Sequence, residues 1–120
     1  MDTETKHDQA KRAGQQAEVK AKHYLEVQGL KFIEQNFRVP QGEIDLIFKD
    51  LQQWVFVEVK YRRTNDHGFA AEYFTASKRS KMNKAIMCYL QQHKFNLNHT
   101  DFRIDLIAMD DNQLPWLYNV

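Results

Sequence analysis

Residues 43–62, EIDLIFKDLQQWVFVEVKYR, contain the two stretches of sequence that decide the fold. In both stretches apolar side chains recur at every second position, which is typical of a β-strand. The strand expected over 43–49 has two different faces, with Ile44, Leu46 and Phe48 on one and Glu43, Asp45 and Ile47 on the other. The strand expected over 54–62 begins apolar on both faces, which favours a central position in a sheet. Only residues 50–53 separate the strands, so we expect a hairpin.

The rest of the chain predicts helices and strands on both sides of this hairpin. Apolar residues at helical spacing run from about Ala10 to Gln28, and Gly29 provides a helix stop. Residues 1–9 are expected to form a disordered tail. In chain order we expect a helix over 10–28, a strand over 31–39, the two hairpin strands, a loop over 64–71, a helix from Thr75 or Ser77 to about Gln91, a strand over 102–108 and an edge strand over 117–120. This order, αβββαβ(β), predicts a mixed α/β or α+β fold, formed as a single domain by residues 10–120.

Composition narrows the class of protein. With 120 residues the chain fits one domain. Its single cysteine, Cys88, excludes an intramolecular disulfide and a cysteine-based structural zinc site, and indicates a reducing compartment. No stretch approaches the ~20 apolar residues that span a bilayer, and the polar N-terminal sequence lacks the apolar core of a signal peptide. We therefore expect a cytoplasmic protein that does not associate with a membrane.

Two carboxylates are expected to face each other across the hairpin. If the turn is centred on residues 51–52, Asp45 lies opposite Glu58 and Glu43 lies opposite Lys60. Like charges directly across a strand pair repel, and burial increases the cost. A divalent cation would remove this cost, because two carboxylates and the main-chain carbonyl of Val59 are hard oxygen ligands that suit Mg²⁺ or Mn²⁺. Lys60 projects from the same face, where its ammonium group can orient an attacking water or stabilise charge on a phosphate.

Purely structural explanations exist for each of these residues. Surface ion pairing of Glu43 with Lys60, with the other two acids on a solvated sheet face, accounts for the hairpin charges without a site. Glu18 lies within the apolar stripe of the first helix, where an unpaired carboxylate is costly. It either joins the site or pairs with Lys22, one helical turn later.

Basic residues gather in the middle of the chain. Residues 60–84 carry seven Lys or Arg against two Asp or Glu, whereas the remainder carries ten against fourteen. Such a segment is a candidate footprint for a polyanion such as nucleic acid. A solvated helix face that promotes solubility explains the same charges equally well. The candidate nucleic-acid-binding residues are Arg62, Arg63, Lys78, Arg79 and Lys81.

Motifs spread over about residues 10–109 resemble known families. Asp45 and the later Glu58-Val59-Lys60 resemble the Asp…Glu-x-Lys signature of the restriction-endonuclease-like (PD-(D/E)xK) superfamily. The longer motifs are Gly14-x-x-x-Glu18-x-x-Ala21-x-x-Tyr24-Leu25-x-x-x-Gly29, Asn36-x-Arg38, Gly42-Glu43-Ile44-Asp45-Leu46-Ile47, Val55-Phe56-Val57-Glu58-Val59-Lys60-x-Arg62, Gly68, Lys78 and Phe102-Arg103-Ile104-Asp105. Together they resemble the bacterial YraN family of small proteins, which is similar to the archaeal Holliday-junction resolvases of that superfamily.

This resemblance implies a fold and a set of site residues. The fold would be a restriction-endonuclease-like mixed central sheet flanked by helices, with the active site on the hairpin and the first helix. Glu18, Asp45 and Glu58 would be metal-ligating acids, and Lys60 would be the catalytic lysine. Ile44 stands where the superfamily signature has proline, a position that does not ligate the metal.

We therefore expect a magnesium- or manganese-dependent endonuclease, a hydrolase of phosphodiester bonds in DNA, with branched or otherwise structured DNA as its substrate. The alternative is a non-catalytic nucleic-acid-binding or protein-interaction module that keeps the nuclease fold. The net charge of +1 favours this alternative, whereas the intact acids and lysine favour the enzyme. A scaffold of structural ion pairs is a third, weaker explanation. A homodimer would suit symmetric cutting of a junction, although no exposed apolar stripe in the sequence requires one.

Overall fold

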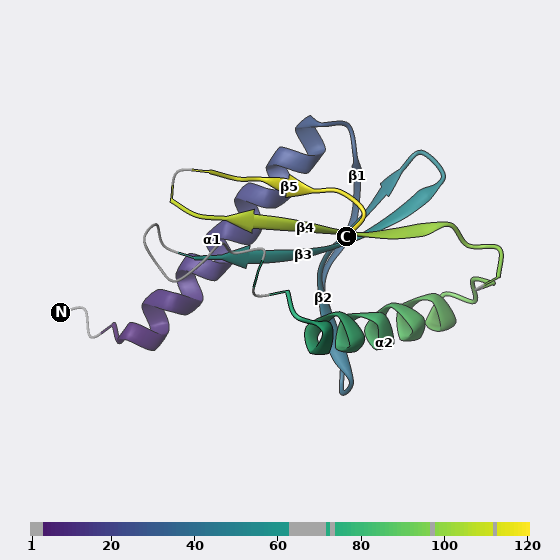
Figure 1. Ribbon diagram of the computed structural model, residues 1–120, viewed down its shortest axis with the longest axis horizontal. Coiled ribbons are helices and arrows are strands. Elements are labelled where there is room, and N and C mark those ends of the chain that lie inside the picture. Colours follow the sequence, from purple (N-terminus) through teal and green to yellow (C-terminus); the bar gives the residue numbers. More distant parts are fainter. Residues whose placement is uncertain (1–3, 63–71, 73, 97, 112) are drawn as a thin grey trace.

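The computed structural model describes residues 4–62, 72, 74–96, 98–111 and 113–120. Within these residues the chain forms, in order, α1 (Lys6–Val27), β1 (Lys31–Val39), β2 (Gly42–Asp50), β3 (Gln53–Tyr61), α2 (Ala76–Gln92), β4 (Phe102–Met109) and β5 (Trp116–Leu117) (Figure 1). The expected order of elements is confirmed, and the edge strand expected over 117–120 is the shorter Trp116–Leu117. The loop expected over 64–71 lies outside the described residues.

The strands form one mixed sheet in the order β1-β2-β3-β4-β5. β1, β2 and β3 are antiparallel neighbours, β4 runs parallel to β3, and β5 is antiparallel to β4. Parallel neighbours need a crossover connection, which α2 provides between β3 and β4. β3 therefore has a neighbour on both sides, as its apolar sequence predicts.

The hairpin of β2 and β3 has the expected register. Leu46 lies opposite Val57, and Asp50 lies opposite Gln53. These pairs are the ones that a turn centred on residues 51–52 produces. Beyond Leu46 and Val57, the same register leads to Asp45 and Glu58.

The two helices cover opposite faces of the sheet (Figure 1). Each buries an apolar stripe against alternate residues of the central strands, which is the ordinary way such layers form a core. On the α1 side the buried residues include Ala17, Ala21, Leu25, Leu46, Phe48, Val55, Val57 and Ile107. On the α2 side they include Ile47, Phe56, Met82, Ala85, Ile86, Tyr89, Leu90 and Ile104. Neither helix in the described part of the chain has the length and apolar character that crossing a bilayer would need.

α1 begins at Lys6 rather than at about Ala10, so residues 6–9, expected in a disordered tail, form its first turn. The Thr5 hydroxyl accepts a 3.1 Å hydrogen bond from the Asp8 main-chain N–H, and the Asp8 carboxylate accepts one of 3.2 Å from the Thr5 N–H. This reciprocal capping box satisfies N–H groups that a helix start leaves open. The Asp8 charge also lies at the favourable end of the helix dipole.

The side-chain alternation of β2 slips at Asp45, which corrects the expected faces of this strand. Ile44 packs in the α2-side cluster together with Ile47, whereas Leu46 packs on the α1 side. On the neighbouring β1, Asn36 has a left-handed φ of 56°. A residue in this conformation bends the strand that contains it and shifts its side chains relative to the regular pleat. The slip therefore lies where Asp45 enters the interior.

A buried ion-pair network fastens the last residues of the chain to β4. The fully buried Asp105 carboxylate accepts hydrogen bonds from Arg103 Nε at 3.1 Å, Trp116 Nε1 at 2.8 Å and the Asn119 N–H at 2.8 Å. The Arg103 guanidinium donates in addition to Asp50 at 3.1 Å. Most of the charge in this network is thereby paired or hydrogen-bonded, as burial requires.

Candidate active site

At Asp45, backbone pairing between β2 and β3 gives way to a hydrogen bond between a side chain and the main chain. Main-chain pairing runs from Asp50 and Gln53 to Leu46 and Val57. Two residues further along β3, the Val59 N–H donates a 2.8 Å hydrogen bond to the Asp45 carboxylate instead of to a backbone carbonyl of β2. Within a strand the N–H and C=O of one residue point to the same side, so the Val59 carbonyl also faces β2. The Asp45 side chain thus bonds to the main chain of β3 beyond the last residues through which the two strands pair.

Asp45 is a buried carboxylate, and the carboxylate of Glu58 nearby is partly buried. Asp45 is only 7% exposed, and burial, together with the nearby charge of Glu58, raises its pKa to about 8. Burial and the charge of Glu43 raise the pKa of Glu58 to about 7, while Lys60 opposes that shift. The convergence of these acids on one ion stays a prediction; the charge of Glu58 is one of the causes that raise the pKa of Asp45. Such a pair does not stabilise the folded protein, because like charges repel and burial raises the cost of each charge.

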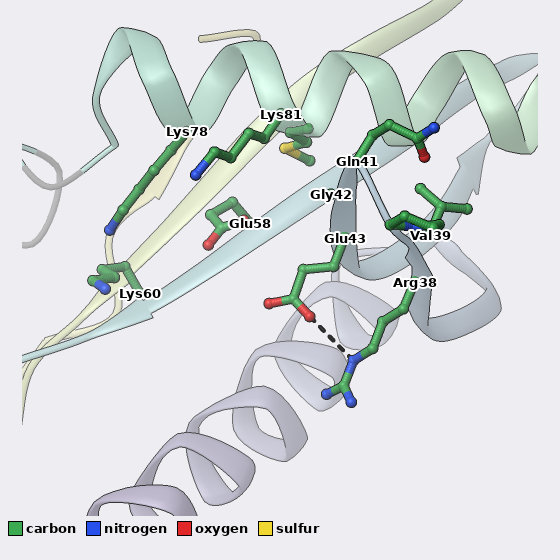
Figure 2. A pocket seen from close by; sticks show the side chains of 11 residues that line it. Arg38, Val39, Gln41, Gly42, Glu43, Glu58, Lys60, Lys78 and Lys81 are labelled. Atoms are coloured by element: carbon green, nitrogen blue, oxygen red, sulfur yellow. Dashed lines mark hydrogen bonds and ion pairs between the residues drawn. The ribbon is translucent and has the colours of Figure 1, made fainter.

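Lys60 and Lys78 bring two ammonium groups together from different elements. Lys60 projects from β3 and Lys78 from the first turn of α2, and their side chains extend toward each other (Figure 2). Burial, followed by the hydrogen bond and the charge of Lys78, lowers the pKa of Lys60 to about 8. The Thr75 hydroxyl caps the helix by accepting the Lys78 N–H at 3.3 Å, which fixes where this turn begins. The ammonium groups of Lys60 and Lys78 therefore lie near Glu58, and the charges of both lysines act on its carboxylate.

A cavity of about 500 Å³ lies between the β1–β2 turn, the end of β3 and the first half of α2. We call it the catalytic cavity, after the function that we propose for it. Glu58 and Lys60 line it from β3, and Lys78 and Lys81 line it from α2 (Figure 2). Gly42, at the β1–β2 turn, also lines the cavity and lies against α2, where a Cβ atom on it would overlap the main-chain carbonyl oxygen of Lys81. Glycine at this position thus allows the turn to pack directly on α2.

Glu18 borders this cluster without completing it. It is half-buried, and burial together with the charge of Glu43 raises its pKa, while Arg38 opposes the shift. Glu43 itself forms a 3.1 Å ion pair with Arg38 (Figure 2). Among the described residues, no three His, Cys, Asp or Glu side chains are already gathered closely enough to hold a metal ion. The Lys22 ammonium, the alternative partner of Glu18, lies 4.0 Å from the centre of the Phe32 ring.

The predicted phosphate-binding residues separate into different places. Lys78 and Lys81 line the catalytic cavity, whereas Arg62 lies in a groove beside α1. Arg79 turns away: its guanidinium donates a 2.8 Å hydrogen bond to the Val120 carbonyl and lies 5.1 Å from the centre of the Phe74 ring. Arg63 is outside the described residues.

The cavity also contains a residue that the sequence analysis does not include among the candidates. Arg38, at the end of β1, lines the catalytic cavity and holds Glu43. Its one signal in the sequence is its place in the Asn36-x-Arg38 motif. The site thus gathers acids on the strands and cations around them, which is an arrangement suited to a metal ion and a phosphate.

Comparisons with known proteins identify the family. The model of "Uncharacterised protein family UPF0102" matches residues 17–109, a span that includes Glu18, Asp45, Glu58 and Lys60. A UPF0102 protein of Shewanella oneidensis is 45% identical over 104 residues, which is 87% of this chain and 94% of the relative. A UPF0102 protein of Vibrio vulnificus is 45% identical over 108 residues, covering 88% of each chain. The chain therefore belongs to the UPF0102 family, which is the YraN family that its motifs predict.

Proposed function

We propose that the protein is a metal-dependent nuclease that hydrolyses phosphodiester bonds in DNA, with branched or otherwise structured DNA as its substrate. The observation that carries this proposal is the carboxylate of buried Asp45 close to that of partly buried Glu58, just beyond the last paired residues of β2 and β3. A fold that only needed stability would gain more from apolar side chains at these positions. A site for a divalent cation needs the acids.

The donor atoms fit magnesium or manganese. Mg²⁺ binds through oxygen, and it commonly uses one or two protein carboxylates together with water and substrate phosphate. Asp45, Glu58 and the Val59 carbonyl are the protein oxygens that would hold it, with Glu18 at the edge of the site. Such a cation supplies Lewis-acid polarisation of the phosphate and a water of lowered pKa.

The chain's own side chains provide the remaining functions. Lys78 and Lys81 project from α2 into the catalytic cavity, where they can hold phosphate oxygens against the acids below. Because the pKa of Lys60 is about 8, part of its population is uncharged near neutral pH. The neutral amine can accept a proton from the attacking water, and the charged form can stabilise the phosphorane-like transition state.

The resemblance to the restriction-endonuclease-like superfamily supports the same assignment, because Asp45, Glu58 and Lys60 lie in the order and on the hairpin that its signature implies. A cytoplasmic location, with Cys88 kept reduced, forms part of the proposal.

A second candidate function is a nucleic-acid-binding module without turnover. It is favoured by one observation: the described residues do not present a ready group of three metal-ligating side chains. The cations of the catalytic cavity would then bind a phosphate backbone, and the acids would shape the site only.

The test combines metal binding with cleavage. Thermal unfolding of the wild type is measured with EDTA, Mg²⁺ or Mn²⁺, beside Glu58→Gln and the exposed control Glu26→Gln. We expect the metal to raise the melting temperature of the wild type and of Glu26→Gln only, because it binds the folded state through Glu58.

The same proteins are then incubated with flaps, forks and four-way junctions. Cleavage by the wild type and the control, lost in Glu58→Gln, supports the nuclease. Binding of these DNAs without any cleavage favours the second candidate, and the absence of both contradicts the two functions together.

A further inference from the structure

A second cavity, of about 610 Å³, opens beside the catalytic cavity on the side of α1. It lies between the N-terminal half of α1 and the end of β3, and we call it the α1 groove. Lys6, Gln9 and Gly14 line it from the helix, and Lys60 and Arg62 line it from the strand and its continuation. Because Lys60 also lines the catalytic cavity, the two hollows meet at this residue.

The charge of the α1 groove fits a polyanion. Among its described lining residues, the charged groups are Lys6, Lys60 and Arg62, all of them basic. A smaller neighbouring hollow further along α1, of about 170 Å³, is lined by Asp110 and Asp111 together with Lys20. A phosphate backbone that leaves the catalytic cavity at Lys60 is therefore attracted more strongly along the first hollow, whose charged lining is basic throughout, than along the second.

Gly14 supplies an independent observation. Within the described residues, Gly29 ends α1 with a positive φ of 101°, and Gly42 is required by the close approach of Lys81. Gly14 lies inside the helix, where glycine is destabilising relative to alanine, yet a Cβ atom there would meet nothing within 4 Å. Packing within the fold therefore does not require glycine at this position. A ligand backbone that approaches the helix closely would require it, because glycine has no side chain to obstruct the approach.

We infer that the α1 groove holds one extended DNA strand on its way to or from the catalytic cavity. Its sugar–phosphate backbone passes over Gly14, with phosphates beside Lys6 and Arg62. A hollow of this volume has the size of a small-ligand site, so it admits a few nucleotides of single strand rather than a double helix. The inference rests on the proposed function for the identity of the ligand, and it narrows the substrate to DNA with an unpaired arm next to the cut, such as a flap or a fork.

Substitutions at Gly14 test the strand path, because they should weaken DNA binding without destabilising the fold. Gly14→Ala and Gly14→Leu both improve helix propensity, so both should raise the melting temperature. If a strand crosses Gly14, the same two changes weaken DNA binding in the order of their size. We expect about a tenfold loss of affinity or more for Gly14→Leu, as for overpacking of a close contact. Gln15→Leu adds the same side chain at an exposed position outside the groove, about 100° further around the helix, and serves as the matched control.

The charge of the groove is tested separately. Lys6→Glu should weaken binding and reduce its dependence on salt, whereas Lys11→Glu, the same change on an exposed residue outside the groove, should do neither. The probe is a fluorescein-labelled thymidine oligomer of about twelve nucleotides, a usual site size for single-strand binders. Binding is measured by anisotropy in EDTA, so that cleavage does not contribute.

The results separate this inference from the proposed function. Ordered loss of oligomer binding through Gly14→Ala to Gly14→Leu, with unchanged binding in both controls, supports the strand path even if no DNA is cut. Wild-type binding by Gly14→Leu and Lys6→Glu, or no oligomer binding by the wild type, overturns the inference. In that case cleavage of a fork by the wild type would still leave the nuclease assignment intact.

Discussion

The Val59 main-chain N–H donates its hydrogen bond to the side chain of Asp45, across a position where two antiparallel strands would otherwise pair through their backbones. This contact joins β2 to β3 beyond their last paired residues and gives the buried Asp45 carboxylate a hydrogen-bond partner. One carboxylate, that of Asp45, therefore both contacts the neighbouring strand and belongs to the proposed metal site.

The first prediction concerns pH. In EDTA the free energy of unfolding should fall between about pH 4 and about pH 8, by on the order of 2–4 kcal/mol. Below this window the folded and unfolded chains both hold a proton on Asp45, so its contribution is complete. Within the window only the folded chain holds the proton, and stability is lost as the pH rises through the raised pKa. Asp45→Asn keeps an acceptor for Val59 without the charge, so urea unfolding should show a weaker pH dependence. An unchanged slope in this variant would contradict the buried carboxylate.

Lys60→Ala should leave metal binding nearly intact and slow DNA cleavage by about 100- to 1,000-fold, the usual effect of removing one group that stabilises charge in a transition state. Single-turnover cleavage of a fork with Mn²⁺ measures the rate, and thermal shift measures metal binding. Lys84→Ala, an exposed lysine on the same helix as Lys78, is the matched control. Equal rates for both variants would remove Lys60 from the mechanism.

Lys81→Ala should lower the dependence of duplex binding on salt by about 0.9 in the slope of log K against log salt, as expected for the loss of one phosphate contact. Arg79→Ala should leave that slope unchanged and instead lower the melting temperature, because its guanidinium holds the Val120 carbonyl and stacks on Phe74. Anisotropy at several salt concentrations and a thermal melt measure the two effects. The opposite assignment of effects would place Arg79 rather than Lys81 on the DNA.

Gly42→Ala should destabilise the fold by about 1–3 kcal/mol, because the added methyl group overlaps the Lys81 carbonyl and pushes the β1–β2 turn off α2. Urea unfolding measures the change. Gly14→Ala is a stringent comparison, since the same substitution at an open helix position should stabilise by about 0.5–1 kcal/mol. Effects of equal sign at the two glycines would refute this assignment of their roles.

The network at the C-terminal end should be sensitive to the loss of one partner. Arg103→Met leaves the fully buried Asp105 charge without its main counterion, which should cost about 3–5 kcal/mol. The double variant Arg103→Met/Asp105→Leu should recover part of that loss, because it removes both charges together. Chemical denaturation of the wild type, Arg103→Met, Asp105→Leu and the double variant measures the coupling, and additive losses would show that the pair is not an interacting unit.

Much of the fold follows from local sequence patterns. The alternation in residues 43–62 and the short turn between the strands are enough to predict the register of Leu46 with Val57, and through it the approach of Asp45 to Glu58. The slip of β2 at Asp45 does not follow, because it accompanies the left-handed conformation of Asn36 on another strand. Alternation in one strand carries no information about the backbone of its neighbour.

The arrangement of the cations depends on long-range contacts that no spacing encodes. Lys78 reaches Lys60 only because α2 crosses over the sheet between β3 and β4. Arg79, one residue later, is withdrawn because the end of the chain folds back and offers the Val120 carbonyl. Helical periodicity places such residues on faces of a helix, but the packing of the helix decides which face meets the site.

The pairing of β3 with β4 also has a consequence for the order in which the molecule folds. Trp54 lies opposite Phe102, so a long connection must close before this parallel ladder forms, whereas β1, β2 and β3 are joined by short turns. Closing long loops costs entropy, and contacts distant in sequence tend to form late. We expect the antiparallel strands to form first and α2 and β4 to dock afterwards, which would leave Asp45 and Glu58 hydrated until the final step. Folding kinetics of Val55→Ala and Ile107→Val should show this as a high φ-value at the first position and a low one at the second, and the reverse pattern would refute it.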